Sequence, residues 1–150
     1  MRQRLYPVLA FVLLAAFAFA GCGCSKPSAT GTPAAGGGAT ISGEVTLAPE
    51  VAAKFKPGMT LFIVARKPEM RPPVAVIRAV PTAFPFKFTL SQANVMMPSV
   101  KFEGEVSVDA RLDQDGDAIS REPGDIAGAA KGNPVKVGAS GVEIRLDSAL

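Results

Sequence analysis

Hydrophobic and polar residues alternate along four stretches of the chain, at residues 40–47, 84–90, 102–112 and 142–147. A period of two places alternate side chains on opposite faces of an extended strand. We therefore expect four strands, each with one face packed on a core and the other face turned to solvent.

Two further stretches, residues 59–65 and 74–80, are apolar at nearly every position. Strands with two apolar faces are typical of the middle of a sheet, so we expect both to be central. A short strand is also expected around residues 134–137. Pro85 has no N–H to donate, which predicts a sheet-edge position for its strand. Seven short strands in about 100 residues predict an all-β, antiparallel two-sheet sandwich.

Two segments between the strands, residues 50–55 and 91–96, are each expected to form one helical turn. Ser91 stands where a capping side chain would begin the second turn. No stretch after residue 40 has the long 3.6-residue period of a larger helix.

The start of the chain has the organisation of a secretory signal. Arg2 and Arg4 precede an unbroken apolar run at residues 9–20, which is shorter than the roughly 20 residues of a membrane span. The sequence Phe-Ala-Gly-Cys that ends at Cys22 resembles the lipobox of bacterial lipoproteins. The resemblance implies that the thiol of Cys22 takes a diacylglyceryl group and that cleavage makes it the first residue. Cys24 is the alternative acceptor.

The composition between this signal and the first strand is typical of a flexible linker. Gly, Ala, Ser, Thr and Pro dominate residues 22–39, and no large apolar side chain is present. The sequence therefore predicts a signal peptide at residues 1–21, a lipidated start and linker at 22–39, and a folded domain at 40–150. We expect a lipid-anchored membrane protein of the cell envelope that faces the periplasm.

Composition excludes several classes of function. The chain has no His, so Ser-His-Asp and Cys-His relays and imidazole metal sites are ruled out. An enzyme would need acid–base chemistry without the side chain that most often supplies it, and we expect no enzyme and no cofactor. Removing residues 1–21 leaves 14 basic and 13 acidic residues. Nucleic acid is therefore not an expected partner.

Several strand and turn signatures follow one another along the chain, at residues 41–50, 56–66, 71–76, 86–90, 96–98, 108–112, 116–118, 123–126 and 134–138. In this order they are similar to the C-terminal, immunoglobulin-like periplasmic domain of the cytochrome c-type biogenesis protein H (CcmI-type) family. The similarity extends from Thr40 to the C-terminus.

The resemblance implies an immunoglobulin-like β-sandwich and a non-catalytic role in c-type cytochrome maturation. Family members are chaperones that deliver apocytochrome c to the haem-ligation machinery, and a tetratricopeptide-repeat region is credited with holding the apocytochrome. The implied partner is a maturation component or apocytochrome c. The strand of Pro85 or the C-terminal strand would accept an extended partner segment by strand addition. The alternative is a structural or calcium-binding envelope lipoprotein unrelated to cytochromes.

One acidic segment is a candidate metal site. Asp113, Asp115 and Asp117 alternate around Gly116, and oxygen ligands at such spacing can surround Ca²⁺. The spacing does not match an EF-hand, and Asp and Gly are also the residues that a tight turn needs. Both interpretations stay open.

A pair of methionines and a set of three phenylalanines are the remaining candidates for function. The methionine pair at residues 96–97 offers thioether ligands to Cu(I), although Met is also common in cores. Phe84, Phe86 and Phe88 are expected to point inward, because they alternate with polar residues. No binding surface beyond the two strand edges is predicted.

Overall fold

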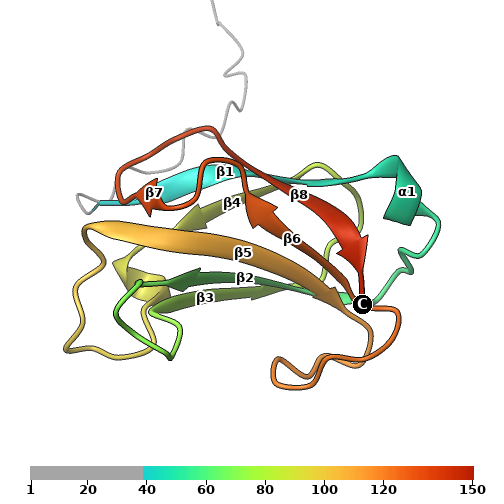
Figure 1. Cartoon of the computed structure of the whole chain (residues 1–150), viewed down its shortest axis with the longest axis horizontal. Coiled ribbons are helices and arrows are strands. Elements are labelled where there is room, and N and C mark those ends of the chain that lie inside the picture. Colours follow the sequence, from blue (N-terminus) through green and yellow to red (C-terminus); the bar gives the residue numbers. More distant parts are fainter. Residues whose placement is uncertain (1–38) are drawn as a thin grey trace, which may run out of the picture. The chain divides into compact units, whose positions relative to one another are not determined.

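A computed structural model of the protein describes residues 39–150, which form eight strands, a short helix and a 3₁₀ turn (Figure 1). The predicted signal peptide at 1–21, the lipidation site Cys22 and the linker up to residue 38 lie outside the described residues. No helix among the described residues is long and apolar enough to cross a membrane. The elements are β1 (Ile41–Leu47), α1 (Pro49–Ala52), β2 (Thr60–Arg66), β3 (Ala75–Ala79), β4 (Phe86–Leu90), η1 (Gln92–Asn94), β5 (Glu105–Asp113), β6 (Ile126–Ala130), β7 (Val135–Lys136) and β8 (Val142–Ala149).

The strands follow one continuous path of pairing, in the order β3-β2-β5-β6-β8-β1-β4, and β7 pairs with β5 beside this path. Figure 1 shows β2, β3 and β5 in one layer and β1, β4 and β8 in the other. All pairs are antiparallel except β1 with β8, which run parallel. The predicted all-β sandwich is confirmed, with one more strand than expected and this one parallel pair.

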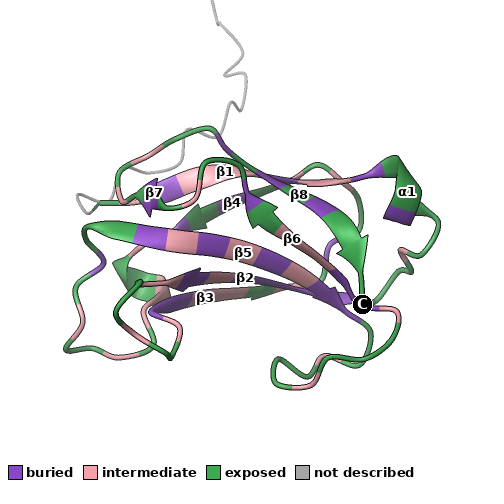
Figure 2. Ribbon diagram, viewed as in Figure 1, coloured by how far each residue is buried: buried purple, intermediate pink, exposed green. Residues whose placement is uncertain are grey.

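The core lies between the two layers and follows the predicted alternation. Along β5, Val106, Val108, Ala110 and Leu112 are buried while the residues between them are more exposed, as the alternating colours of Figure 2 show. Burying one such aliphatic side chain stabilises the fold by about 1.5–3 kcal/mol. The alternating residues of β8 pack against the same core from the other layer.

Two glycines allow β8 to lie between its neighbours. A Cβ at Gly43 of β1 would collide with the carbonyl oxygen of Val142, and one at Gly128 of β6 would collide with that of Arg145. Gly128 stands where the pairing of β6 with β8 shifts register, at a β-bulge. The close approach on both sides of β8 therefore depends on residues that have no side chain.

Two predictions about strand position are wrong. The stretch at 74–80, expected to be central, forms β3 at the end of the pairing order, although Val95 bridges to Ala75 and the Met96 N–H donates to Val74 O at 3.0 Å. The C-terminal strand β8, expected to offer a free edge, lies between β6 and β1. Hence β8 cannot accept an added strand, because both of its edges are paired. β4, which follows Pro85, is an edge strand as predicted.

One strand, the three phenylalanines and the helix cap complete the comparison with the sequence-based predictions. Strand β6 was not predicted, because its sequence IAGAA has no contrast between large apolar and polar residues. Of the three phenylalanines expected to point inward, Phe88 is buried, while Phe84 and Phe86 are partly buried against the core. The predicted cap is confirmed: the Ser91 hydroxyl accepts a hydrogen bond from the Ala93 N–H at 3.3 Å.

Candidate functional site

The register of the strands builds a continuous row of side chains across the outer face of the sheet. Val76 of β3 lies opposite Val64 of β2, which lies opposite Asp109 of β5, which in turn lies opposite Ala129 of β6. Side chains that are paired in this way sit side by side on one face. The row is apolar on β2 and β3 and small on β6.

A second row runs parallel to the first. It consists of Arg78, Phe62, Arg111, Ala127 and Ser148, on β3, β2, β5, β6 and β8 respectively. The Phe62 ring lies between two guanidinium groups, 5.9 Å from that of Arg78 and 6.0 Å from that of Arg111. Stacked cations of this kind are attracted to the ring face and cover it from water. Phe62 is therefore buried although it points outward.

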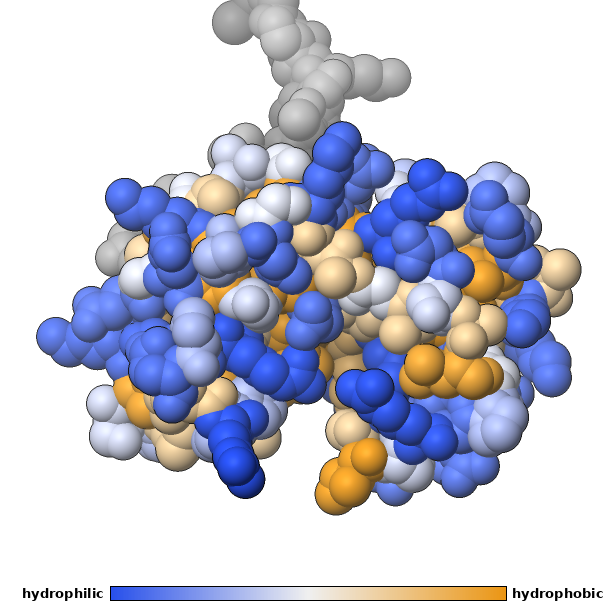
Figure 3. Space-filling view, viewed as in Figure 1, coloured by the Kyte–Doolittle hydropathy of each residue, from blue (hydrophilic) through white to orange (hydrophobic). Residues whose placement is uncertain are grey.

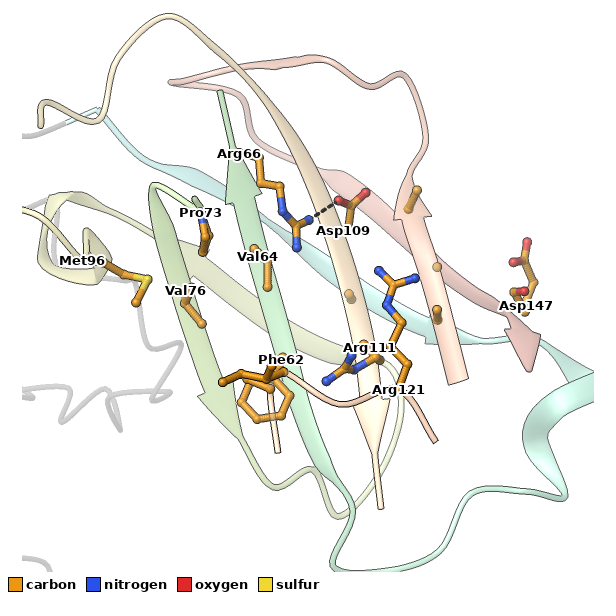
Figure 4. Close-up of a pocket in the computed structure, with 17 residues that line it drawn as sticks. Phe62, Val64, Arg66, Pro73, Val76, Met96, Asp109, Arg111, Arg121 and Asp147 are labelled. Atoms are coloured by element: carbon orange, nitrogen blue, oxygen red, sulfur yellow. Dashed lines mark hydrogen bonds and ion pairs between the residues drawn. The ribbon is translucent and has the colours of Figure 1, made fainter. Parts of the chain in front are cut away.

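A groove of about 770 Å³ lies along these two rows. Figure 4 shows Phe62, Val64 and Val76 next to one another on its floor. The floor continues over β6, where Ala127 and Ala129 replace the large side chains of the neighbouring strands. The hollow thus arises because the face changes from bulky to small side chains across the sheet.

Exposed apolar side chains form the two walls of the groove. On the β3 side stand Pro73 and Met96, whose exposed fraction is 60 %. Another part of the rim is formed by the segment between β5 and β6, residues 114–124, which presents Ile119, 92 % exposed. Figure 3 shows apolar atoms exposed among charged ones on the face that carries β5, β6 and this loop. Two of the four exposed large hydrophobic residues in the described part of the chain therefore border one groove.

The charged residues of the groove differ in how they are paired. Arg66 Nη1 lies 2.7 Å from Asp109 Oδ2, and both side chains are 40 % exposed (Figure 4). Such an exposed pair contributes at most about 1 kcal/mol to stability. Arg121 reaches from the loop over the sheet, and it has no ion-pair partner within 4 Å among residues 39–150. Arg121 is therefore the guanidinium of the groove that is available to a ligand.

Two buried aspartates hold the base of the 114–124 loop. Asp113 Oδ1 accepts hydrogen bonds from the Gly116 and Asp117 N–H groups, and Asp125 accepts from the Gln114 and Glu122 N–H groups. Both carboxyl groups are 1 % exposed and face one cation, since Arg111 lies 2.9 Å from Asp113 and 4.0 Å from Asp125. The loop is thereby fixed at both ends, and its tip is left at the groove wall.

The pKa values of two carboxyl groups in this loop move in opposite directions. Burial raises the pKa of Asp113 from its ordinary value of 3.8, and Asp125 adds to the rise while Arg111 opposes it. The N–H of Asp117 donates to Asp115 at 2.9 Å and lowers the pKa of that carboxyl. Exposed Asp115 is thus charged, whereas the charge on Asp113 is disfavoured.

The structure places the predicted calcium ligands in one turn but gives their carboxylates other partners. Asp113 points to backbone N–H groups, and Asp117 accepts from the Ile119 N–H at 2.9 Å. Within residues 39–150, no three acidic, His or Cys side chains are grouped as a metal site. Calcium binding at this turn stays a prediction. Met96 is exposed at the groove and is not core filler.

The groove itself was not predicted from the sequence. Its signal in the sequence is the apolar character of residues 59–65 and 74–80 on both faces, a pattern that predicts burial in the centre of a sheet. In the structure their outward residues Phe62, Val64 and Val76 form the groove floor. This floor can be predicted only if β6, with its small side chains, is known to pair with β5.

One likeness to a solved structure has no bearing on function. The fold is similar to that of an alternative pilotin from the type II secretion system of Vibrio cholerae, with a TM-score of 0.42 and 14% identity, covering 73% of this chain and 96% of that one. At this level the likeness supports no argument.

The sequence comparisons are specific. Residues 41–147 match the family model described as the cytochrome c-type biogenesis protein H Ig-like domain. The chain is also 35% identical, over 99 residues, to the cytochrome c-type biogenesis protein CycH of Pseudomonas aeruginosa. That match covers 64% of this chain and 24% of the relative, so the chain spans about a quarter of the length of that protein. The chain therefore belongs to the family of cytochrome c-type biogenesis protein H immunoglobulin-like domains.

Proposed function

We propose that the protein is a lipid-anchored, non-catalytic binding module of the periplasm that assists the maturation of c-type cytochromes. The observation that carries the proposal is the family match over residues 41–147, which includes every strand except the last residues of β8. The similarity to CycH supports a role in cytochrome c biogenesis. Its partner would be a component of the maturation machinery or apocytochrome c.

The chemistry of the groove supports binding rather than catalysis. Its polar side chains are arginines, aspartates and Ser148, and the chain has no His to serve as an acid–base group. Arg66 and Asp109 neutralise each other, and Arg111 is held by buried carboxylates. Among the described residues, the groove lining offers one hydroxyl group, that of Ser148, and no Lys or Cys, whereas apolar floor and walls are what protein recognition uses.

The anchor in this proposal is supported by the sequence at Cys22, which follows an apolar run and two small residues. Acyl chains on one residue supply about 0.8 kcal/mol per buried CH₂, so several chains give stable attachment. Residues 22–39 would then connect the membrane surface to the domain, whose first strand begins at Ile41.

A deletion strain tests the proposed function. We expect membranes of the deleted strain to contain less c-type cytochrome, measured by staining for covalently bound haem, and the content to return when the wild-type gene is supplied. Unchanged cytochrome content in the deleted strain would contradict the proposal. If the envelope were weakened at the same time, that result would favour the alternative of a structural lipoprotein.

A further inference from the structure

We propose that the groove is the docking site for a short segment of a partner protein that carries apolar side chains and one carboxylate. This inference rests on the proposed function and deepens it, because it says where the partner binds and which chemistry the module recognises. The occupant is a protein segment, and the carboxylate faces Arg121.

The apolar part of the inference rests on exposure. Val64 and Val76 are half-buried on the outer face of the sheet, a surface that a domain ordinarily covers with polar side chains, and buried Phe62 lies beside them. Ile119 is 92 % exposed and Met96 60 % exposed at the walls. Exposed apolar side chains that gather around one hollow mark an interaction surface. A partner that inserts apolar side chains would remove Ile119, Met96 and the exposed parts of Val64 and Val76 from water.

The charged part rests on the pairing of the arginines. Arg66 pairs with Asp109 at 2.7 Å, and Arg111 lies beside two buried carboxyl groups, 2.9 Å from Asp113 and 4.0 Å from Asp125. Arg121 lines the same groove and makes no ion pair within 4 Å among the described residues. Asp147 also lines the groove without an ion pair among these residues, but Figure 4 shows it at the margin, away from the apolar floor of Phe62, Val64 and Val76. A guanidinium next to an apolar floor favours a ligand carboxylate, because the pair gains a charge-assisted hydrogen bond.

The groove also differs from a site for strand addition. The backbone groups of β2, β5 and β6 beneath it are already used in pairing on both sides. At the nearest edge, β3 is bridged by Val95, and Val74 O accepts from the Met96 N–H. The partner is therefore recognised by its side chains and not by its backbone.

Peptide binding tests this recognition with the full chain in lipid nanodiscs, and empty nanodiscs serve as the blank. The probes are two fluorescein-labelled amphipathic peptides with the same Leu and Ala positions, one with Glu and the other with Lys beside the apolar face. We expect the Glu peptide to bind at least tenfold more tightly than the Lys peptide, as measured by fluorescence anisotropy. Equal binding of both peptides, or no binding of the Glu peptide below about 1 mM, would overturn the inference.

Matched variants locate the site. Ala129 is an exposed groove residue, and Ala129→Phe fills the hollow, whereas Ala83→Phe adds the same bulk at an exposed position outside the groove lining. Arg121→Glu reverses the charge in the groove, and exposed Lys87 allows the corresponding Lys87→Glu control on β4. We expect the two groove variants to bind the Glu peptide at least tenfold more weakly than the wild type does, and the two control variants to bind it within twofold of the wild type. Equal effects in groove and control variants would refute the assignment.

A cellular measurement separates this inference from the proposed function. In a strain whose only copy is Ala129→Phe, we expect cytochrome content to fall toward that of the deleted strain, with the protein present at the wild-type level. Wild-type cytochrome content in that strain, together with a loss in the deleted strain, would refute the groove and leave the proposed function standing. No loss in the deleted strain would refute the proposed function itself.

Discussion

The guanidinium group of Arg111 lies 6.0 Å from the centre of the Phe62 ring, on neighbouring strands of the same sheet face. This contact joins the two halves of the candidate site, because the ring belongs to the apolar floor and the arginine is held by the aspartates at the base of the 114–124 loop. The stacked pair therefore connects the groove floor to the loop that forms part of its wall.

Replacing Phe62 by Ala tests the structural importance of that pair. We expect Phe62→Ala to lower the free energy of unfolding by about 2 kcal/mol, because a ring that is only 6 % exposed is lost from between two guanidinium groups. Urea denaturation measures the change. Val80 is 59 % exposed, and Val80→Ala is the control, with a change within about 0.5 kcal/mol. Similar losses in both variants would contradict the packing described for Phe62.

The glycines beside β8 give a second prediction. We expect Gly43→Ala and Gly128→Ala each to destabilise the fold by about 3 kcal/mol, because the added methyl groups meet backbone atoms of β8 that cannot move without breaking pairing. Thermal unfolding followed by far-ultraviolet circular dichroism measures the loss. Thr89 is exposed on edge strand β4, and Thr89→Ala serves as the comparison. A variant at Gly43 as stable as the wild type would show that β1 and β8 are farther apart than described.

The raised pKa of Asp113 predicts a pH dependence of a definite sign. Because the folded state holds the proton of the Asp113 carboxyl group more tightly than the unfolded chain does, the contribution of Asp113 to stability is greatest below pH 3.8. It decreases as pH rises through the raised pKa. We therefore expect the free energy of unfolding of the wild type to decrease relative to that of Asp113→Asn as pH rises above about 4. Urea denaturation at several pH values measures both. A difference that moves in favour of the wild type over that interval would mean that the ion pair with Arg111 outweighs burial.

Lipid attachment at Cys22 is tested by metabolic labelling. We expect a fatty-acid analogue to label the wild-type chain and the Cys24→Ser variant and to leave Cys22→Ser unlabelled, because only Cys22 directly follows the Phe-Ala-Gly sequence. In-gel fluorescence of the purified chain measures the incorporation. Labelling that disappears in Cys24→Ser alone would move the anchor to the alternative cysteine.

The sequence allowed the fold class to be predicted because period-two alternation reports directly which face of a strand is buried. Val106, Val108 and Leu112 are inside, as their pattern indicates. Strand β6 was missed since alanine and glycine give no such contrast, and the position of β8 was missed since pairing order is set by contacts distant in sequence. Local patterns identify strands, but they do not say which strands are neighbours.

The candidate site was predictable only in fragments for the same reason. Each component left a trace: apolar outward residues such as Val64 and Val76, the small Ala129, and the arginine-bearing loop that follows β5. Val76, Val64 and Ala129 come from three strands that the register of the sheet brings into one row, and the loop borders this row. The acidic turn drew attention in the sequence as a metal site, yet in the structure Asp113 fixes the loop that forms the groove wall.

Photo-crosslinking from the groove in living cells tests the central claim most directly. A benzoylphenylalanine residue replaces exposed Ile119 on the groove wall, or Ala83 outside the groove as the control, and crosslinked products are identified by mass spectrometry. We expect a crosslink from position 119, and none from position 83, to apocytochrome c or a cytochrome c maturation component. Crosslinks from position 119 only to other copies of this chain, or the same products from both positions, would contradict the proposed docking site.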